Sequence, residues 1–234
     1  MDRRLQRELK EAYCLSFERF GHQNWWPGET DFEICVGAIL TQNTAWTNVE
    51  KAIQNLKNAG LLSPQRLYKL TLEEIAIHIK PSGYFNIKAK RLKNFINTLV
   101  EKFEGNVQKL LEGERTEVRH RLLAINGIGK ETSDSMMLYA GHHLIFVVDA
   151  YTRRIFSRHE WCSEDADYDE VQAICENNLN DADVKDILDY WQDYHAQLVM
   201  IGKNFCKNRN PKCDLCPLKS LLKSEKKWAG LKIS

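Results

Sequence analysis

The stretch of sequence that decides the fold is residues 121–140, RLLAINGIGKETSDSMMLYA. It predicts an apolar helix end, a tight turn that carries Gly127 and Gly129, and a second apolar helix from Thr132 onward. Glycines let a backbone approach a phosphate closely, and the amides that open the second helix would point the positive end of its dipole at that phosphate. Lys130 adds a positive charge. Because such turns also join ordinary helical hairpins, these residues alone leave DNA binding as one of two interpretations.

The remainder of the chain is patterned for helices. Apolar residues recur three and four positions apart, as they do in amphipathic helices. Helix starts are predicted at Ser63, at the capping box that begins with Thr71, and at Asp167. The only β-like run, residues 144–148, has no partner strand. We therefore expect an all-α fold of two helical lobes.

The composition indicates a globular protein that is not exported. A chain of 234 residues that is 43% hydrophobic can bury a substantial core. The first residues are charged from position 2, and no apolar run approaches the roughly 18 residues that a membrane span requires. We therefore expect a cytoplasmic protein, associated with the nucleoid in a bacterium. Seven cysteines at irregular spacing favour a reducing compartment over a disulfide framework.

Charge is segregated along the chain, although the net charge is only +1. Residues 160–189 contain eleven Asp and Glu against one Lys, whereas residues 203–227 contain eight Lys and Arg against two acids. One face of the protein could therefore repel DNA while another attracts it. Two ordinary solvated helix faces would give the same counts, so both interpretations stay open.

A carboxylate follows the hairpin where an apolar run ends. Residues 146–154 read FVVDAYTRR, with Asp149 at the start of a helix, where any aspartate can act as an N-cap. Together, the hairpin, the spacer and Val-Val-Asp resemble the signature of the endonuclease III superfamily of helix-hairpin-helix DNA glycosylases. The resemblance implies that Asp149 lies in a cleft between two lobes, faces a flipped nucleotide and is catalytic. An ionised carboxylate suits this reaction, because glycosidic cleavage develops positive charge on the sugar and uses an oriented water.

The superfamily is divided by the residue two positions after the last hairpin glycine. Its bifunctional members have a lysine there, which attacks the sugar and then cuts the strand, whereas this chain has Glu131. Lys130 is one residue away, and on a helix that step turns a side chain by about 100 degrees. We therefore expect a glycosylase without lyase activity.

Three tryptophans lie within or beside one motif in residues 25–46, WWPGETDFEICVGAILTQNTAW. A glycosylase extrudes the damaged base, fills the vacated place in the stack and holds the base between flat apolar walls. The residues expected to do so, in part by the resemblance, are Trp25, Trp26, Trp46 and Lys203 in the base pocket and Gln42 and Asn43 as the wedge. Asn43 is the better match to the wedge residue of the family. For each single tryptophan, a place in the core is the alternative.

Within the superfamily, the chain resembles the 3-methyladenine DNA glycosylase III group in three motifs. They are LTQNT at residues 40–44, KPSGYFNIKAKR at residues 80–91 and GIGKET at residues 127–132. The resemblance extends from about residue 25 to about residue 203. It implies stacked aromatic side chains, Trp46 among them, that select bases with a weakened, cationic glycosidic bond. The implied substrate is a methylated purine such as 3-methyladenine.

The same resemblance implies a central lobe at residues 31–145 and a second lobe at residues 1–30 and 146–234. A monomer would bind double-stranded DNA with a damaged base, and no membrane. The residues expected to contact DNA are Gly127, Gly129, Lys130 and Thr132 in the hairpin and Lys207, Arg209 and Lys212 in a C-terminal basic loop. Two alternatives stay open. One is a glycosylase for oxidised or mismatched bases, because pocket residues decide the base; the other is a non-catalytic relative that binds damaged DNA.

Three cysteines, Cys206, Cys213 and Cys216, repeat the spacing of three of the four ligands of the endonuclease III iron–sulfur cluster. The fourth ligand should come six residues later, where this chain has Leu222, and no cysteine follows. A cubane cluster normally takes four thiolates, and no histidine lies beyond His195 to complete a zinc site. The sequence therefore leaves a [4Fe-4S] cluster as an open alternative at this loop and predicts no other cofactor.

Overall fold

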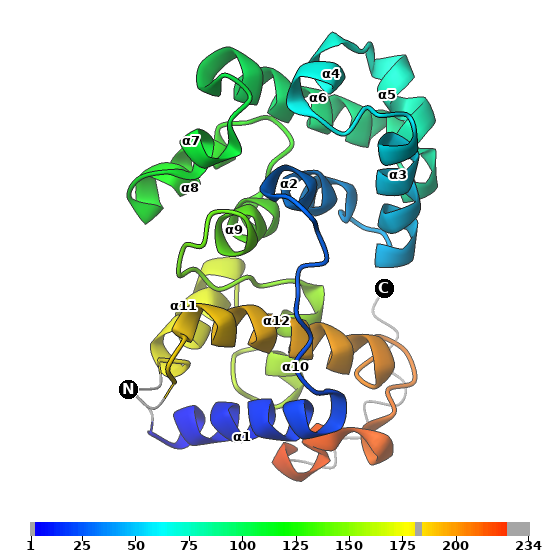
Figure 1. The fold of residues 1–234 in the computed structure, drawn as a ribbon. Helices are drawn as coiled ribbons and strands as arrows, with labels where there is room; N and C mark the ends of the chain where they lie inside the picture. Colours follow the sequence, from blue (N-terminus) through cyan, green and yellow to red (C-terminus); the bar gives the residue numbers. More distant parts are fainter. Residues whose placement is uncertain (1–2, 181–183, 224–234) are drawn as a thin grey trace. The chain divides into compact units, whose positions relative to one another are not determined.

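The computed structural model describes residues 3–180 and 184–223, and every regular element in these ranges is helical (Figure 1). The all-α prediction is therefore confirmed. The chain forms two compact units: a terminal unit, Met1–Trp25 with Phe146–Ser234, and a middle unit, Trp26–Ile145. Within the described ranges, none of the helices is long and apolar enough to cross a membrane.

The middle unit is built around one buried helix. α2 (Asp31–Leu40) is capped by the Thr30 hydroxyl, which accepts a hydrogen bond from the Glu33 amide at 3.2 Å, and all residues from Phe32 to Leu40 are buried. Helices α3, α6, α7 and α9 pack against it. The other helices of this unit are α3 (Trp46–Asn58), α4 (Pro64–Lys69), α5 (Leu72–Ile79), η1 (Lys80–Ser82), α6 (Phe85–Phe103), α7 (Val107–Leu111), α8 (Arg115–Leu123) and α9 (Lys130–Tyr139).

Local signals start these helices as the sequence predicts. The Ser63 hydroxyl caps α4, and Thr71 forms a capping box with Glu74 at the start of α5. The apolar sets spaced for α3 and α6 are buried in the core; they are Val49, Ile53, Leu56, Leu92, Phe95, Ile96 and Leu99. Helix periodicity therefore decides which faces of the middle unit meet.

A buried lysine holds the end of α2. Lys88 of α6 is 1% exposed, and its Nζ donates hydrogen bonds to the carbonyl oxygens of Leu40 at 2.8 Å and Ser82 at 2.7 Å. Burial, together with the nearby charge of Arg91, lowers the pKa of Lys88 to about 8. Because a helix leaves its last carbonyls without internal donors, Lys88 fixes the point at which the chain leaves α2.

The terminal unit is built around α12 (Ile187–Asn204), which packs on α1 and α10. Its buried face includes Trp191, Tyr194 and Leu198. The predicted cap at Asp167 is present as a capping box with Glu170. The other elements are α1 (Arg3–Phe20), α10 (Ala150–Arg158), α11 (Tyr168–Asn178), η2 (Cys213–Leu215) and η3 (Pro217–Leu221).

The β-like run is buried without forming a strand, because side chains of α11 satisfy its backbone. The Phe146 amide donates to the Glu176 carboxylate at 2.9 Å, and Gln172 Nε2 donates to the Phe146 carbonyl at 2.7 Å. The Val148 amide donates to the Tyr168 hydroxyl at 3.4 Å. A buried extended segment needs partners for its polar groups, and here a helix surface supplies them in place of a neighbouring strand.

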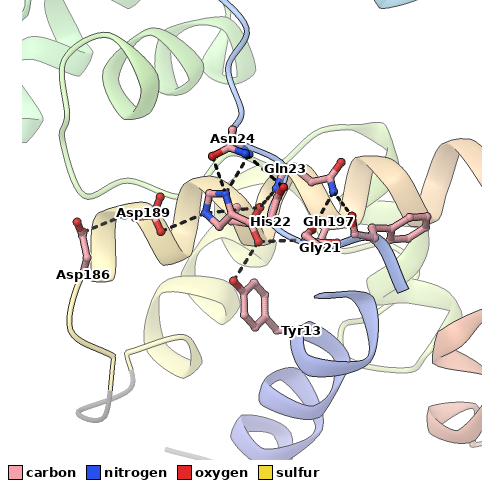
Figure 2. A network of polar contacts seen from close by, with 10 residues as sticks. Tyr13, Gly21, His22, Gln23, Asn24, Asp186, Asp189 and Gln197 are labelled. Carbon is pink, nitrogen blue, oxygen red and sulfur yellow. Dashed lines mark hydrogen bonds and ion pairs between the residues drawn. The ribbon is translucent and has the colours of Figure 1, made fainter. Parts of the chain in front are cut away.

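A buried carboxylate ties α1 and the segment after it to α12. Asp193 is 1% exposed and accepts hydrogen bonds from the Tyr13 hydroxyl at 3.0 Å, the Gln23 amide at 2.7 Å and Gln197 Nε2 at 3.1 Å. Figure 2 shows this network with its donors Tyr13, Gln23 and Gln197 labelled. Gln197 Nε2 also donates to the Gly21 carbonyl at 2.7 Å. The segment that leads to the first two tryptophans of the sequence is therefore fixed on α12.

Candidate active site

The predicted helical hairpin is present in the middle unit, where α8 ends at Leu123 and α9 begins at Lys130. Gly127 has a φ of +101°, and a Cβ added there would lie 2.3 Å from Cγ of Arg91. Only glycine meets both conditions. At Gly129, the N-cap of α9, an added Cβ would meet no atom within 4 Å. The turn is therefore tight on its inner side and open where the first amides of α9 begin.

Gln42, one of the two candidate wedge residues, is bonded to this hairpin. Its Nε2 donates to the Gly127 carbonyl at 3.2 Å and to the Thr132 hydroxyl at 2.9 Å, and its Oε1 accepts a hydrogen bond from Arg91. Both ends of its amide group are therefore used within the protein. The next residue, Asn43, is exposed and has a φ of +53°, so of the pair Asn43 is the side chain at the surface.

Two further contacts brace the hairpin. Asn94 Nδ2 of α6 donates to the Asn126 carbonyl at 2.9 Å. Arg119 of α8 binds both carboxylate oxygens of the buried Asp134 of α9, at 2.8 and 3.0 Å. A bidentate guanidinium–carboxylate pair fixes orientation as well as distance. The two helices of the hairpin therefore have a defined geometry before any ligand binds.

Two of the three predicted pocket tryptophans lie together in the middle unit. The Trp26 and Trp46 rings meet edge to face with centroids 5.1 Å apart, and the Tyr139 ring lies 5.3 Å from Trp26. Gly37 of α2 makes room for them, because a Cβ there would lie 3.1 Å from Trp26 and 3.3 Å from Trp46. Trp46 Nε1 donates to the Glu50 carboxylate at 2.8 Å. Both tryptophans are only half-buried, so they retain exposed ring surface.

Tyr139 was not among the residues that sequence reasoning selected. It is the last residue of α9 and is buried. In the sequence, Tyr139 is marked only by its place at the end of an apolar helix, and that pattern predicts a core residue. Trp25 belongs to the terminal unit, where it is half-buried, and Lys203 is exposed in the last turn of α12 of that unit.

Asp149, in the terminal unit, is the N-cap of α10. Its Oδ1 accepts a hydrogen bond from the Thr152 amide at 2.7 Å, so Asp149 does act as a helix cap, as any aspartate at this position can. Its Oδ2 lies 3.8 Å from Nε2 of His195, and the Asp149 side chain is 13% exposed. The helix dipole stabilises negative charge at this end of α10. Capping therefore fixes one carboxylate oxygen, while the other faces an imidazole.

His195 of α12 is 4% exposed, and the edge of its ring meets Phe146 at a centroid distance of 6.5 Å. Burial lowers the pKa of His195, which the charge of Asp149 raises in part. The imidazole is therefore neutral at neutral pH. Sequence reasoning missed this residue as a neighbour of Asp149, because a histidine on an apolar helix face reads as core and nothing local connects it to a carboxylate 46 positions earlier.

The position that would carry the lyase lysine is Glu131 in the first turn of α9, and it is exposed. Lys130, the first residue of the helix, is half-buried. The two side chains leave the helix about 100 degrees apart. In the structure, as in the sequence, Glu131 and not Lys130 occupies the position that corresponds to the lyase lysine.

The three clustered cysteines line one cavity in the terminal unit. Cys206 follows α12, Cys213 is the first residue of η2, and Cys216 directly follows η2. The cavity, of about 330 Å³ including its mouth, is also lined by Arg158, His159, Phe205, Leu218, Lys219 and Leu222. All three thiols are free. In the described part of the chain, no group of three or more His, Cys, Asp or Glu side chains is placed to hold a metal ion.

The basic residues expected to contact DNA in this loop are at the surface. Lys207, Arg209 and Lys212 are all exposed. The Lys212 amide donates to the Phe205 carbonyl at 2.9 Å, which closes the loop at its base. The loop backbone is therefore bonded while its cationic side chains face solvent.

A two-unit helical chain with a glycine hairpin, followed by an aspartate that caps a helix, is the scaffold of a helix-hairpin-helix DNA glycosylase. The family model described as HhH-GPD superfamily base excision DNA repair protein matches residues 36–181. The chain belongs to this superfamily, and it is a DNA glycosylase of base excision repair.

Individual relatives and solved structures support the assignment to this superfamily. The chain is 45% identical over 219 residues to a Methanocaldococcus jannaschii protein named "Putative DNA repair glycosylase", covering 93% of this chain and 96% of that one. The crystal structure of the Helicobacter pylori 3-methyladenine DNA glycosylase bound to 1,N6-ethenoadenine matches with a TM-score of 0.72 at 28% identity, over 85% of this chain and 97% of that chain. A trapped endonuclease III–DNA covalent intermediate matches in fold, with a TM-score of 0.79 at 21% identity, over 95% of this chain and 97% of that chain.

Proposed function

We propose that this chain is a monofunctional glycosylase that removes an alkylated purine, such as 3-methyladenine, from double-stranded DNA. The observation that carries the proposal is Asp149, which has one carboxylate oxygen fixed by α10 and the other facing the buried His195. The similarity to the H. pylori 3-methyladenine glycosylase supports the substrate class.

The two oxygens of Asp149 would have different tasks. Oδ1 keeps the carboxylate in place through the Thr152 amide, while Oδ2 stabilises positive charge on the sugar and accepts a proton. In the hydrolysis, the bond between C1′ and the base nitrogen breaks and its electron pair moves to the base. A water oxygen bonds to C1′, and the proton of that water passes to Asp149. The neutral His195 leaves the negative charge of Asp149 available for this step.

Base selection would depend on the aromatic cluster of Trp26, Trp46 and Tyr139. An alkylated purine carries positive charge on its ring, and indole faces attract cations that are removed from water. Asn43 would fill the place left by the flipped base, because its side chain is exposed beside the hairpin whereas that of Gln42 is bonded to it.

The reaction would stop at base release. Schiff-base chemistry requires an amine at the sugar, and Glu131 offers a carboxylate at the corresponding position. Borohydride reduction during the reaction with a lesion duplex should therefore leave protein and DNA unlinked. Efficient trapping that disappears in the Lys130→Ala variant would show instead that this chain is a bifunctional enzyme.

The test of the substrate is chromatography of the bases released from methylated DNA, run beside single-lesion duplexes that carry uracil, oxidised pyrimidines or mismatches. We expect release of 3-methyladenine without strand cleavage. Release of an oxidised or mispaired base instead would reject the alkylated-purine pocket and favour the second enzymatic alternative. Binding to damaged duplexes without release of any base would favour a non-catalytic relative.

A further inference from the structure

The cysteine loop, residues 206–216, lies where the superfamily resemblance places an iron–sulfur cluster. We propose that, in this chain, two arginines of α10, Arg154 and Arg158, hold the loop in place of a cluster and thereby present Lys207 and Arg209 to DNA phosphates. The proposal rests on DNA binding by the superfamily and does not depend on which base is removed.

The donor set does not fit a cluster bound by four thiolates. Leu222, at the position of the fourth ligand, lines the cavity with an apolar side chain. Arg158 Nη1 donates a hydrogen bond to Cys206 Sγ at 3.2 Å, so one of the three remaining sulfurs already has a cationic partner from the protein. A cubane cluster normally takes four thiolates, and the cavity supplies three.

The arginines bond three consecutive residues of the loop. Arg154 Nε donates to the Cys206 carbonyl at 2.7 Å. Arg158 donates through Nη1 to the Lys207 carbonyl at 2.8 Å and through Nη2 to the Asn208 carbonyl at 3.3 Å. Hydrogen bonds from a guanidinium are stronger than those between neutral groups, and its planar fork sets direction as well as distance. The contacts therefore fix the main chain from which Lys207 projects.

Helix α10, which carries the two arginines, is itself fixed against α12. A Cβ added to Gly202 would lie 2.2 Å from Cδ1 of Tyr151, so α10 and α12 approach each other more closely than any other residue at position 202 would allow. The Arg154 guanidinium lies over the Tyr151 ring at 5.1 Å. The loop begins directly after α12, and α10 holds both that helix and the first loop residues.

This arrangement connects two functions along one helix. α10 begins at the proposed catalytic residue Asp149 and carries Arg154 and Arg158 in its second half. The side chains of Lys207 and Arg209 are exposed, as phosphate contacts require, while the backbone between them is bonded to α10. Phosphate contacts of the loop would thus set the position of Asp149 through a single rigid element.

The first test combines metal analysis with a cysteine-free loop. Protein purified without oxygen should contain iron and zinc well below one equivalent per chain. The triple variant Cys206→Ser, Cys213→Ser and Cys216→Ser should bind an undamaged duplex within about twofold of wild type, because it keeps every phosphate contact. Stoichiometric iron would overturn the proposal. So would stoichiometric zinc, which His159 of the same cavity would have to complete, or a loss of DNA binding in the triple variant.

The second test removes the arginines and measures the loop directly. In the double variant Arg154→Gln and Arg158→Gln, amide hydrogen exchange of residues 207–212 should accelerate. The affinity for undamaged duplex should fall on the order of tenfold, and the slope of log affinity against log salt should fall by about 2, because two phosphate contacts lose their positions. The matched control is Arg153→Gln on the same helix, whose guanidinium donates to the Ala166 carbonyl and not to the loop. Loop exchange in that control should stay at the wild-type rate.

Arg158→Lys separates positioning from charge. It keeps the cation but loses the fork, so loop exchange should still accelerate. It also serves as the milder variant if the double substitution prevents folding. Wild-type exchange in the loop of either arginine variant would overturn the proposal, whatever the DNA affinity, whereas failure of the base-release experiment would leave it unaffected.

Discussion

α10 and α11 of the terminal unit both begin with an aspartate that caps the helix. Asp149 accepts the Thr152 amide at 2.7 Å, and Asp167 accepts the Glu170 amide at 2.9 Å. Beyond this shared bond the two sites differ. The Asp167 amide is bonded back by the Glu170 carboxylate, which closes a capping box, whereas the second oxygen of Asp149 faces the buried His195. Helix capping accounts for the presence of an aspartate at both positions. Of the two, only Asp149 has a second carboxylate oxygen that faces an imidazole.

The sharpest way to separate the two sites is to replace each aspartate with asparagine. Asparagine caps a helix about as well as aspartate, so both variants should fold. Asp149→Asn should lower single-turnover base release by on the order of 10²- to 10⁴-fold while DNA affinity is kept. Asp167→Asn, the matched control, should release base at the wild-type rate. Equal rates in the two variants would mean that Asp149 is a cap and nothing more.

A second difference is how closely each helix approaches its neighbour. Gly202→Ala would place a Cβ 2.2 Å from Tyr151 of α10. Overpacking of this kind costs about 1–3 kcal/mol, and urea denaturation should show that loss together with slower base release. The control is Ala173→Ser, an exposed position on α11, where the change should stay within about 0.5 kcal/mol. Wild-type stability of Gly202→Ala would show that α10 is free to move away from α12.

His195 gives the α10 site a pH dependence that the α11 cap lacks. Burial lowers the pKa of His195 below its ordinary value of 6.5, so in the native state it stays neutral where the unfolded chain binds a proton. Native stability contributed by this group is therefore lost as pH falls below about 6.5. In His195→Asn, the drop in unfolding free energy between pH 7 and pH 5 should be smaller than in wild type.

The same variant should release base at close to the wild-type rate at pH 7, because asparagine, like the neutral imidazole, leaves the negative charge of Asp149 available. The wild-type rate should also fall more steeply toward acid than that of His195→Asn, because protonated His195 would compete for the Asp149 charge. Parallel pH profiles in the two proteins would remove His195 from the mechanism and leave it a core residue.

The smallest effect is expected at the start of α11. Asp167→Ala removes the cap acceptor and should cost about 1 kcal/mol of unfolding free energy. Base release should not change once the protein is folded. If the fully folded Asp167→Ala variant lost activity, the starts of α10 and α11 would be coupled. That result would contradict the difference between the two sites.

Much of the fold could be predicted from the sequence because its signals are local. Ser63, Thr71 and Asp167 cap their helices through residues three positions away, and the spacing of apolar residues selects the buried faces. The hairpin was recognisable for the same reason, since Gly127 needs a positive φ that its residue type permits.

The parts that were missed depend on residues distant in sequence. Nothing near Gln42 indicates that its amide is bonded to Gly127, 85 positions later, and nothing near Asp149 indicates His195. The sequence showed that the β-like run at residues 144–148 has no partner strand, but it did not show that side chains of α11 bond its backbone instead. Likewise, the loss of the fourth cysteine at Leu222 was visible in the sequence, but the arginine contacts beside it were not.

For genetics, the buried carboxylate of Asp193 marks a position where a conditional allele is to be sought. One side chain there accepts hydrogen bonds from Tyr13 and Gln23 near the start of the chain and from Gln197 on its own helix. Replacing Asp193 would leave several hydrogen-bond donors without an acceptor, at a cost of about 1–3 kcal/mol each. This loss is enough to unfold a marginally stable protein at elevated temperature but not at a permissive one. A cell carrying such an allele would lose this repair activity by a temperature shift alone, with the base-releasing residues unaltered.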